Sequence, residues 1–304
     1  MRELAIEYFQ GLRDRIVARV AALDGADFVR KDWVRPEGGG GQMSELRGEV
    51  IEKGGCNFSA VWGERYPTVP GSGAQGEGKS GAEGSGKAGA NGDGAALAER
   101  ARIDELLGVR PPKPEELAGK PFFATGVSLV MHPKNPFVPV VHMNVRYFEA
   151  GDLAWFGGGL DLTPCVPFDE DTRHFHDTLK RTCDAHGPER YPRFSQWAKD
   201  YFFIQHRNSE RGVGGIFFDY LRRDRERDFE FVQDVGDSFL NAWVPLVLRR
   251  KGTPVTDEDR ARQLKWRGRY VEFNLVYDRG TLFGLKTGGN IEAIFMSLPP
   301  LVAW

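Results

Sequence analysis

Apolar positions along the chain recur with two periods, 3.6 residues and two residues, which indicate helices and strands respectively. The helical period predicts helices over residues 3–22, 169–186, 193–210, 228–250 and 256–266. Alternation and short apolar runs predict strands over residues 48–53, 57–62, 122–131, 139–148, 152–162, 213–218, 270–277 and 281–286.

Turn and capping signals set some of the boundaries. Thr256, with Asp259 three residues later, comes close to a capping box at the start of the last helix. Residues 278–280, Asp-Arg-Gly, have the composition of a hairpin turn between the last two strands. The glycines at 38–41 predict a loop.

The order of these elements predicts the fold class. Strands arrive in sequential pairs rather than in strict alternation with helices, so we expect a large, mainly antiparallel sheet covered by helices, in the α+β class. We expect one domain over residues 1–304. Residues 71–94 contain ten glycines and no large apolar side chain, so nothing there offsets the cost of ordering the chain. We interpret this segment as a disordered insertion within the domain.

Composition excludes several classes of protein. A net charge of −2 and a pI near 6.3 give no reason to expect a nucleic-acid partner. Charges run through the first amphipathic segment, so it is not a signal peptide. No uncharged stretch approaches the roughly 20 residues that span a bilayer. We therefore expect a soluble protein of the cytoplasm.

One strand carries an unusual set of polar side chains. Side chains alternate between the two faces of a strand, so His142, Asn144 and Arg146 share one face. Arginine matches a carboxylate with two parallel hydrogen bonds, which lysine does not supply. The trio suits a pocket for an acidic substrate, although a polar strand face that meets solvent would have the same pattern.

Two other segments carry candidate polar groups. Glycines at 157–159 precede Asp161 and allow a flat ligand or another backbone to approach closely. Asp161 could accept hydrogen bonds from N–H groups or simply begin a turn. In the predicted strand 270–277, Tyr270, Glu272 and Asn274 share a face with Asp278, which fits a pocket wall or a solvated edge equally well. No glycine run matches a dinucleotide or phosphate-binding motif.

Histidines and cysteines raise the question of a metal. His132, His142, His176 and His206 are widely spaced and lack the short His-x-x-x-His pairing of helical zinc sites. They fit metal ligands or hydrogen-bonded core residues. Cys56, Cys165 and Cys183 form no zinc or iron–sulfur pattern.

Four runs together resemble one family, the oxygen-dependent coproporphyrinogen III oxidases of haem biosynthesis. They are GVSLVMHPKNPFVPVVHMNVRYFE, WFGGGLDLTPCVPF, FFIQHRNSERGVGGIFFDYL and RGRYVEFNLVYDRGTLFGLKTGGNIEAIFMSLPP. The similarity is continuous from about Pro121 and extends more weakly over the first 65 residues. It implies a flat antiparallel sheet between helical layers, a deep cleft for the substrate, and a homodimer formed through about residues 270–304.

The resemblance also implies an activity and its residues. Two propionates of coproporphyrinogen III become vinyl groups, which gives protoporphyrinogen IX, CO2 and H2O2, with O2 as co-substrate and no organic cofactor. The implied catalytic residues are His142, as proton donor, Asp161 and Arg146. The implied substrate-binding residues are Ser128, Asn144, Val145, Arg146, Asp161, Asp278, Gly288, Gly289 and Asn290. Some members are assigned a divalent metal at the positions of His132, His142, His176 and His206.

Asn290 departs from the family pattern, because many relatives have arginine there. Asparagine cannot form a charge-assisted pair with a propionate, so that contact is expected to be weaker or supplied elsewhere. The residues nevertheless fit the substrate. A tetracarboxylate requires cationic forks such as Arg146, and its pyrrole N–H groups require an acceptor such as Asp161.

Two alternatives stay open from the sequence: a histidine-ligated metal oxygenase or hydrolase acting on another polyacid, and a porphyrin carrier without turnover. The oxygen-independent enzyme of the same step uses an iron–sulfur cluster. This chain lacks the closely spaced cysteines that such a cluster requires.

Overall fold

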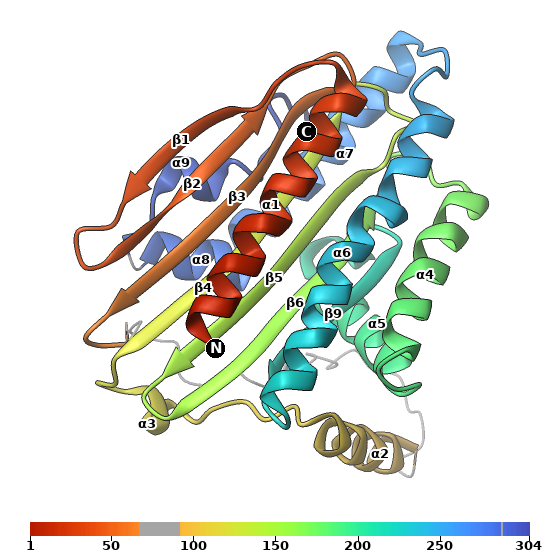
Figure 1. Ribbon diagram of the computed structural model, residues 1–304. Helices are drawn as coiled ribbons and strands as arrows, with labels where there is room; N and C mark the ends of the chain where they lie inside the picture. The colour runs from red at the N-terminus through yellow and green to blue at the C-terminus, as the bar shows by residue number, and fades with distance from the viewer. Residues whose placement is uncertain (67–91, 287) are drawn as a thin grey trace.

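The computed structural model describes residues 1–66, 92–286 and 288–304, which are built around one sheet. Its seven strands lie in the order β1-β2-β3-β4-β5-β6-β9, and each neighbouring pair is antiparallel (Figure 1). The strands are β1 (Val29–Val34), β2 (Gly39–Leu46), β3 (Ile51–Gly63), β4 (Phe122–Pro133), β5 (Val140–Ala150), β6 (Leu153–Thr163) and β9 (Gly214–Leu221). The predicted α+β class is confirmed.

Helices cover both faces of this sheet (Figure 1). On one face lie α1 (Arg2–Asp24) and α6 (Arg225–Arg250), with α4 (Asp169–Asp184) beside α6. On the other lie α7 (Asp257–Val276), α8 (Arg279–Lys286) and α9 (Ile291–Phe295). The remaining elements are α2 (Gly92–Leu107), α3 (Pro114–Leu117), α5 (Arg190–Tyr201) along β9, and the short β7 (Phe203–Ile204), η1 (Gln205–Arg207) and β8 (Ser209–Glu210).

The main core lies between the sheet and the α1/α6 layer. The first helix buries Phe9, Leu12, Ile16 and Val20, whereas Leu4 is exposed. These residues recur at helical spacing, so one side of α1 removes its apolar surface from water. The sheet supplies the opposite wall through every second side chain, such as Val145 of β5, which is fully buried.

Near the C-terminus the two predicted strands, 270–277 and 281–286, are wrong. Residues up to Val276 continue α7, and residues 279–286 form α8. Tyr270, Phe273 and Asn274 are buried together at helical spacing, a pattern that the local alternation of apolar residues concealed. Asp278 accepts a hydrogen bond from the Thr281 backbone and so begins a helix rather than a hairpin. The capping box at Thr256 is confirmed, but its helix is longer than the predicted 256–266.

Other predicted boundaries also needed correction. The glycines at 38–41 form part of β2 rather than a loop, and β1 was missed, because it is a largely exposed edge strand with little apolar pattern. The predicted strands 48–53 and 57–62 are one strand, β3. The predicted helix 193–210 ends at Tyr201 and is followed by β7, η1 and β8. Of the predicted insertion 71–94, residues 71–91 lie outside the described residues, and 92–94 begin α2.

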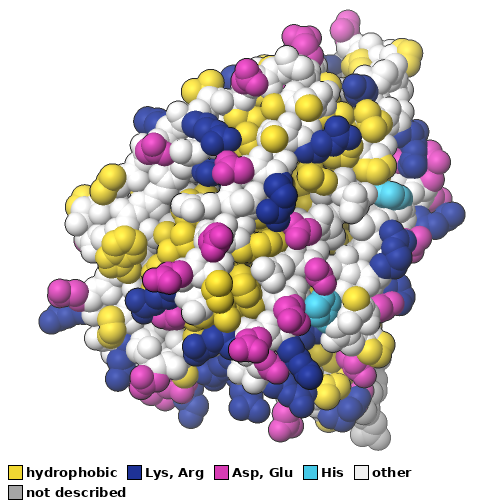
Figure 2. Space-filling model, in the orientation of Figure 1, with side chains coloured by type: hydrophobic (Ala, Val, Ile, Leu, Met, Phe, Trp, Pro, Cys, Tyr) yellow, Lys and Arg dark blue, Asp and Glu magenta, His cyan; other side chains and the backbone are white. Residues whose placement is uncertain are grey.

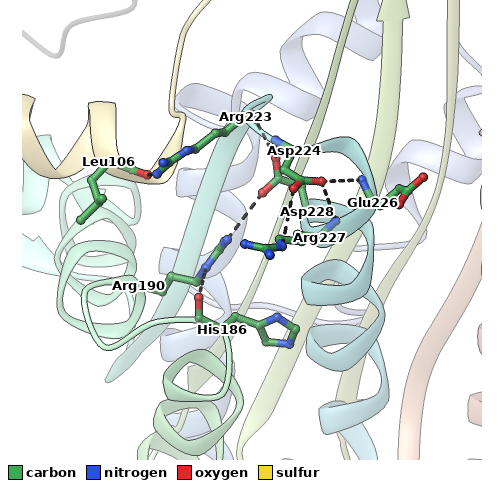
Figure 3. Close-up of polar contacts among 8 residues, drawn as sticks. All are labelled: Leu106, His186, Arg190, Arg223, Asp224, Glu226, Arg227 and Asp228. Carbon is green, nitrogen blue, oxygen red and sulfur yellow. Dashed lines mark hydrogen bonds and ion pairs between the residues drawn. The ribbon is translucent and has the colours of Figure 1, made fainter.

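A polar cluster holds the chain that follows β9 (Figure 3). Arg190 of α5 lies 3.5 Å from the carboxylate of Asp228 in α6 and donates to the backbone oxygen of His186. Asp228 also accepts the backbone N–H of Arg223, whose side chain donates to Leu106 of α2. Burial raises the pKa of Asp228. The cluster therefore fixes the segment next to the end of β9, close to the candidate site described below.

The surface over α1 and α6 intersperses basic and acidic side chains with apolar ones (Figure 2). Among the described residues, no helix combines the length and the apolar character that crossing a membrane requires.

Candidate active site

The predicted polar face of β5 is confirmed by the alternation of burial along the strand, and it faces the α7–α9 side of the sheet. His142, Asn144 and Arg146 are partly exposed, whereas Met143 and Tyr147 on the opposite face are fully buried. Val145 is buried with the latter two, so its side chain points away from any ligand on the polar face.

Strand register brings other predicted residues onto that face. Ser128 of β4 pairs with Asn144, and Asp161 of β6 pairs with His142. Gly157 and Gly159 stand opposite Arg146 and Asn144. The floor of the site therefore combines small residues with few, well-separated polar groups.

Asp161 lies between two cationic or ionisable partners. His142 Nδ1 is 2.7 Å from Asp161 Oδ1, and the buried Arg211 donates to Asp161 Oδ2. Burial alone would raise the pKa of Asp161, but Arg211 and His142 outweigh it and hold this pKa below its usual value. The guanidinium of Arg211 also stacks 4.1 Å from the Phe202 ring and 4.8 Å from that of Tyr270.

This arrangement changes the interpretation of Asp161. Both of its oxygens already accept hydrogen bonds, and its side chain is only 3% exposed. The prediction that it accepts pyrrole N–H groups stays a prediction, and a ligand would have to reach a side chain that has little exposed surface. In the described arrangement Asp161 instead orients His142 through Nδ1 and leaves the imidazole Nε2 for a ligand.

Arg146 forms the second polar centre. Its Nη1 donates to Asn144 Oδ1 at 2.5 Å, and its Nη2 lies 2.7 Å from Asp219 Oδ2. The two centres stand four residues apart on one strand face, roughly 14 Å. A flat, extended acid can contact both.

The start of α8 contributes from the opposite side. Tyr201 Oη donates to Asp278 Oδ1 at 2.8 Å, and the guanidinium of Arg279 lies 5.0 Å from the Tyr201 ring centre. Burial lowers the pKa of Arg279, but the Tyr201, Tyr220 and Asp219 side chains outweigh this and raise it. Asp278 thus holds the turn that presents Arg279 to the site.

Three residues of the site were not singled out from the sequence. They are Arg211, Asp219 and Arg279. Arg211 and Asp219 lie in the run that resembles the family, but nothing local separates a buried arginine from an exposed one. Arg279 was assigned to a hairpin turn, so its place at the start of a helix was not foreseen.

In this structure the predicted residues near 290 make local contacts that shape the backbone around α9. Asn290 Oδ1 accepts the Ala293 N–H and caps α9, and the Gly289 N–H donates to Gly284. Gly288 has a φ of 71°, in the left-handed region that glycine tolerates. Their contact with a substrate stays a prediction.

The four predicted metal-binding histidines do not converge. His132 is buried against Ser297, and burial lowers its pKa to about 3. His176 contacts Tyr191 and the Val213 carbonyl. The remaining two, His206 and His142, pair with Glu272 and Asp161 respectively. Within residues 1–66, 92–286 and 288–304, no three His, Cys, Asp or Glu side chains gather as metal ligands. The residues therefore do not fit the metal that the family resemblance suggested.

The deep cleft implied by the resemblance is not seen beside Asp161. The pocket that lies there measures only about 10 Å³ and is lined by residues that include Lys199, Phe202 and Arg211. Sites for drug-sized ligands measure roughly 300–1,000 Å³. A whole tetrapyrrole does not fit this pocket, so the pocket alone does not account for substrate binding.

A comparison with protein-family models gives the relationship directly. The model described as coproporphyrinogen III oxidase matches residues 5–304, nearly the whole chain. This includes all four runs whose similarity was noted in the sequence. The match shows that the chain belongs to the coproporphyrinogen III oxidase family and has a role in porphyrin and haem biosynthesis.

Proposed function

We propose that this protein is an oxygen-dependent coproporphyrinogen III oxidase. For each of two propionates, a CH2–CH2–COOH side chain and O2 give a vinyl group, CO2 and H2O2. The final product is protoporphyrinogen IX. Electrons leave the side chain as its carbon–carboxyl bond breaks, and dioxygen accepts them together with two protons.

The observation that supports this best is the shared sheet face. Arg146 supplies a guanidinium for a carboxylate, and the His142–Asp161 pair supplies an oriented imidazole on the same face. Asp161 holds Nδ1, so Nε2 can hold or move a proton at the reacting ring. Arg211 neutralises Asp161, so the centre needs no further cation.

The cysteines support oxygen as the oxidant. An iron–sulfur enzyme needs closely spaced thiolates. Here Cys56 and Cys183 are buried, and burial raises the pKa of each thiol to about 12, which disfavours the thiolate. Cys165 is far from both in sequence.

Product analysis tests the proposal. Reduced substrate is incubated aerobically and anaerobically, each with and without a chelator, and vinyl product is followed by fluorescence after oxidation. We expect product only in air, and product that survives chelation. A protein that binds the porphyrin but yields no product in air would be a carrier. Loss of activity on chelation and its return with one metal would favour a metal oxygenase.

Arg146→Lys should weaken productive binding, since a single ammonium cannot reproduce the bidentate fork. We expect KM for coproporphyrinogen to rise roughly tenfold, the scale of one charge-assisted hydrogen bond. Steady-state kinetics measure this. Arg15→Lys makes the same exchange in an exposed ion pair with Asp237, on the opposite side of the sheet, and serves as the control. Unchanged KM in Arg146→Lys would remove Arg146 from its assigned role.

The predicted homodimer also remains a proposal. Large apolar side chains are exposed in the C-terminal region, including Val276, Ile291, Leu301 and Trp304. Exposed apolar patches of this kind commonly form interfaces.

Light scattering after gel filtration tests the dimer. We expect twice the 34.0 kDa chain mass for the unchanged protein and a shift toward the monomer in Leu301→Asp. Leu97→Asp on α2 places the same charge at another exposed leucine and should leave the dimer intact. A monomer in the unchanged protein would refute the prediction.

A further inference from the structure

Arg146 is already paired with a carboxylate of the protein itself. Its Nη2 lies 2.7 Å from Asp219 Oδ2, with the Asp219 side chain 11% exposed and that of Arg146 29% exposed. The proposed function assigns the same guanidinium to a substrate propionate. The Asp219 carboxylate and the substrate propionate would therefore compete for the guanidinium of Arg146.

The backbone is shaped to bring Asp219 there. Phe156 pairs with Leu221 and Gly158 with Phe218, so residues 219 and 220 bulge opposite Gly157. Bulges re-aim side chains and are common beside active sites.

Two further features of the bulge hold the contact. Tyr220 has a φ of 59°, an uncommon conformation for a bulky residue, and its N–H donates to Asp219 Oδ1 at 2.9 Å. At Gly157, an added Cβ would lie 2.5 Å from Asp219 Oδ1 and 2.8 Å from Arg146 Nη2. Any residue but glycine there would require these two side chains to shift.

Asp219 also acts on a second cation. It is among the groups that raise the pKa of Arg279, and it is the largest cause of the rise in the Tyr220 pKa to about 12. Asp219 thus acts electrostatically on two arginines, Arg146 and Arg279.

We propose that Asp219 is an internal stand-in for the substrate carboxylate. It holds Arg146 in the empty site and releases it when a propionate binds. This inference rests on the proposed function and deepens it. The stand-in keeps the fork oriented and its charge compensated, and it disfavours ligands without a carboxylate to displace it. The apparent affinity for the substrate is lower than it would be without Asp219, because in only part of the protein molecules is the Arg146 guanidinium free to bind a propionate.

A purely positioning role for Asp219 makes the opposite prediction. If Asp219 only fixed the rotamer of Arg146 and stayed in place, its removal would loosen the fork and weaken binding. The sign of the change in affinity separates the two roles.

The test is a fluorescence titration with coproporphyrin III, the oxidised, unreactive form of the substrate. We expect Asp219→Asn to lower its Kd on the order of fivefold, by freeing the fork. Asp219→Ser also keeps an oxygen for the Tyr220 N–H and should act in the same direction. Asp152→Asn, in the exposed turn between β5 and β6, removes the same charge as a control and should leave Kd unchanged. Thermal melting confirms that each variant is folded.

The outcomes distinguish this inference from the proposed function. Unchanged or weaker binding in both folded Asp219 variants would overturn the stand-in, while aerobic turnover by the unchanged protein would leave the oxidase proposal standing. Absence of turnover in the unchanged protein would defeat the oxidase proposal, whatever the titration shows.

Discussion

His142→Gln should lower kcat by roughly 10²–10⁴-fold, the usual contribution of a positioned acid–base group. Glutamine keeps a polar side chain of similar reach but cannot hold and release a proton near neutral pH. Asp161 fixes the imidazole through the 2.7 Å contact to Nδ1, and an edge-on contact with Phe202 packs its ring. The substitution should therefore lower kcat much more than it raises KM.

Steady-state kinetics of aerobic turnover measure this, with KM and kcat determined separately. His174→Gln is the matched control, because His174 lies on α4 and contacts only the Asn241 carbonyl among its side-chain partners in the described structure. A kcat equal to that of the unchanged protein would mean that the His142 imidazole moves no proton in the slow step.

The sequence predicted the centre of the site better than its surroundings. On β5 the two-residue period of a strand places His142 and Arg146 on one face, independently of the elements that pack around it. Burial in the structure follows that period. The family resemblance named Ser128 and Asp161 as site residues, and strand register, which was not predicted, brings them onto the same face. Arg211 reaches Asp161 from a segment 50 residues away, so no window of sequence contains the pair.

The misassigned C-terminal segment shows a different limit. YVEFNLVY alternates like a strand, yet Tyr270, Phe273 and Asn274 are also correctly spaced for a helix. Short apolar runs fit both structures, and tertiary packing against Phe202 and its neighbours decides between them. The assignment of 278–280 to a hairpin turn followed from that error, and Arg279 was overlooked with it.

The four histidines illustrate how little spacing constrains a metal site. Each has a hydrogen-bonding partner of its own, and these partners belong to different elements. His206 shows this most clearly, since it falls within the predicted helix 193–210 but lies in η1, with its side chain 41% exposed. Whether four rings meet depends on the whole fold, which the positions in sequence do not determine.

Arg211→Met should destabilise the fold by about 3–5 kcal/mol, the cost of removing one partner from a buried ion pair. Arg211 and Asp161 are 2% and 3% exposed, so water cannot replace the lost guanidinium. Methionine fills most of the volume among Phe202, Tyr270 and Phe273, so the loss comes mainly from the uncompensated carboxylate. Denaturant unfolding measures the change, with Arg102→Met, in an exposed pair with Glu99, as the nearly neutral control.

The stability lost in Arg211→Met should depend on pH, and the direction follows from the pKa of Asp161. The pKa of Asp161 is lowered in the folded protein, so the pair stabilises the fold above the ordinary carboxyl pKa of about 3.9 and loses this effect as pH falls through the folded value. The stability gap between the unchanged protein and Arg211→Met should therefore be complete at neutral pH and narrow in acid. Asp161→Asn in the Arg211→Met background should recover part of the loss, because the unpaired charge is gone. A gap independent of pH, with no recovery in the double variant, would mean that Arg211 stabilises the protein by packing rather than by its charge.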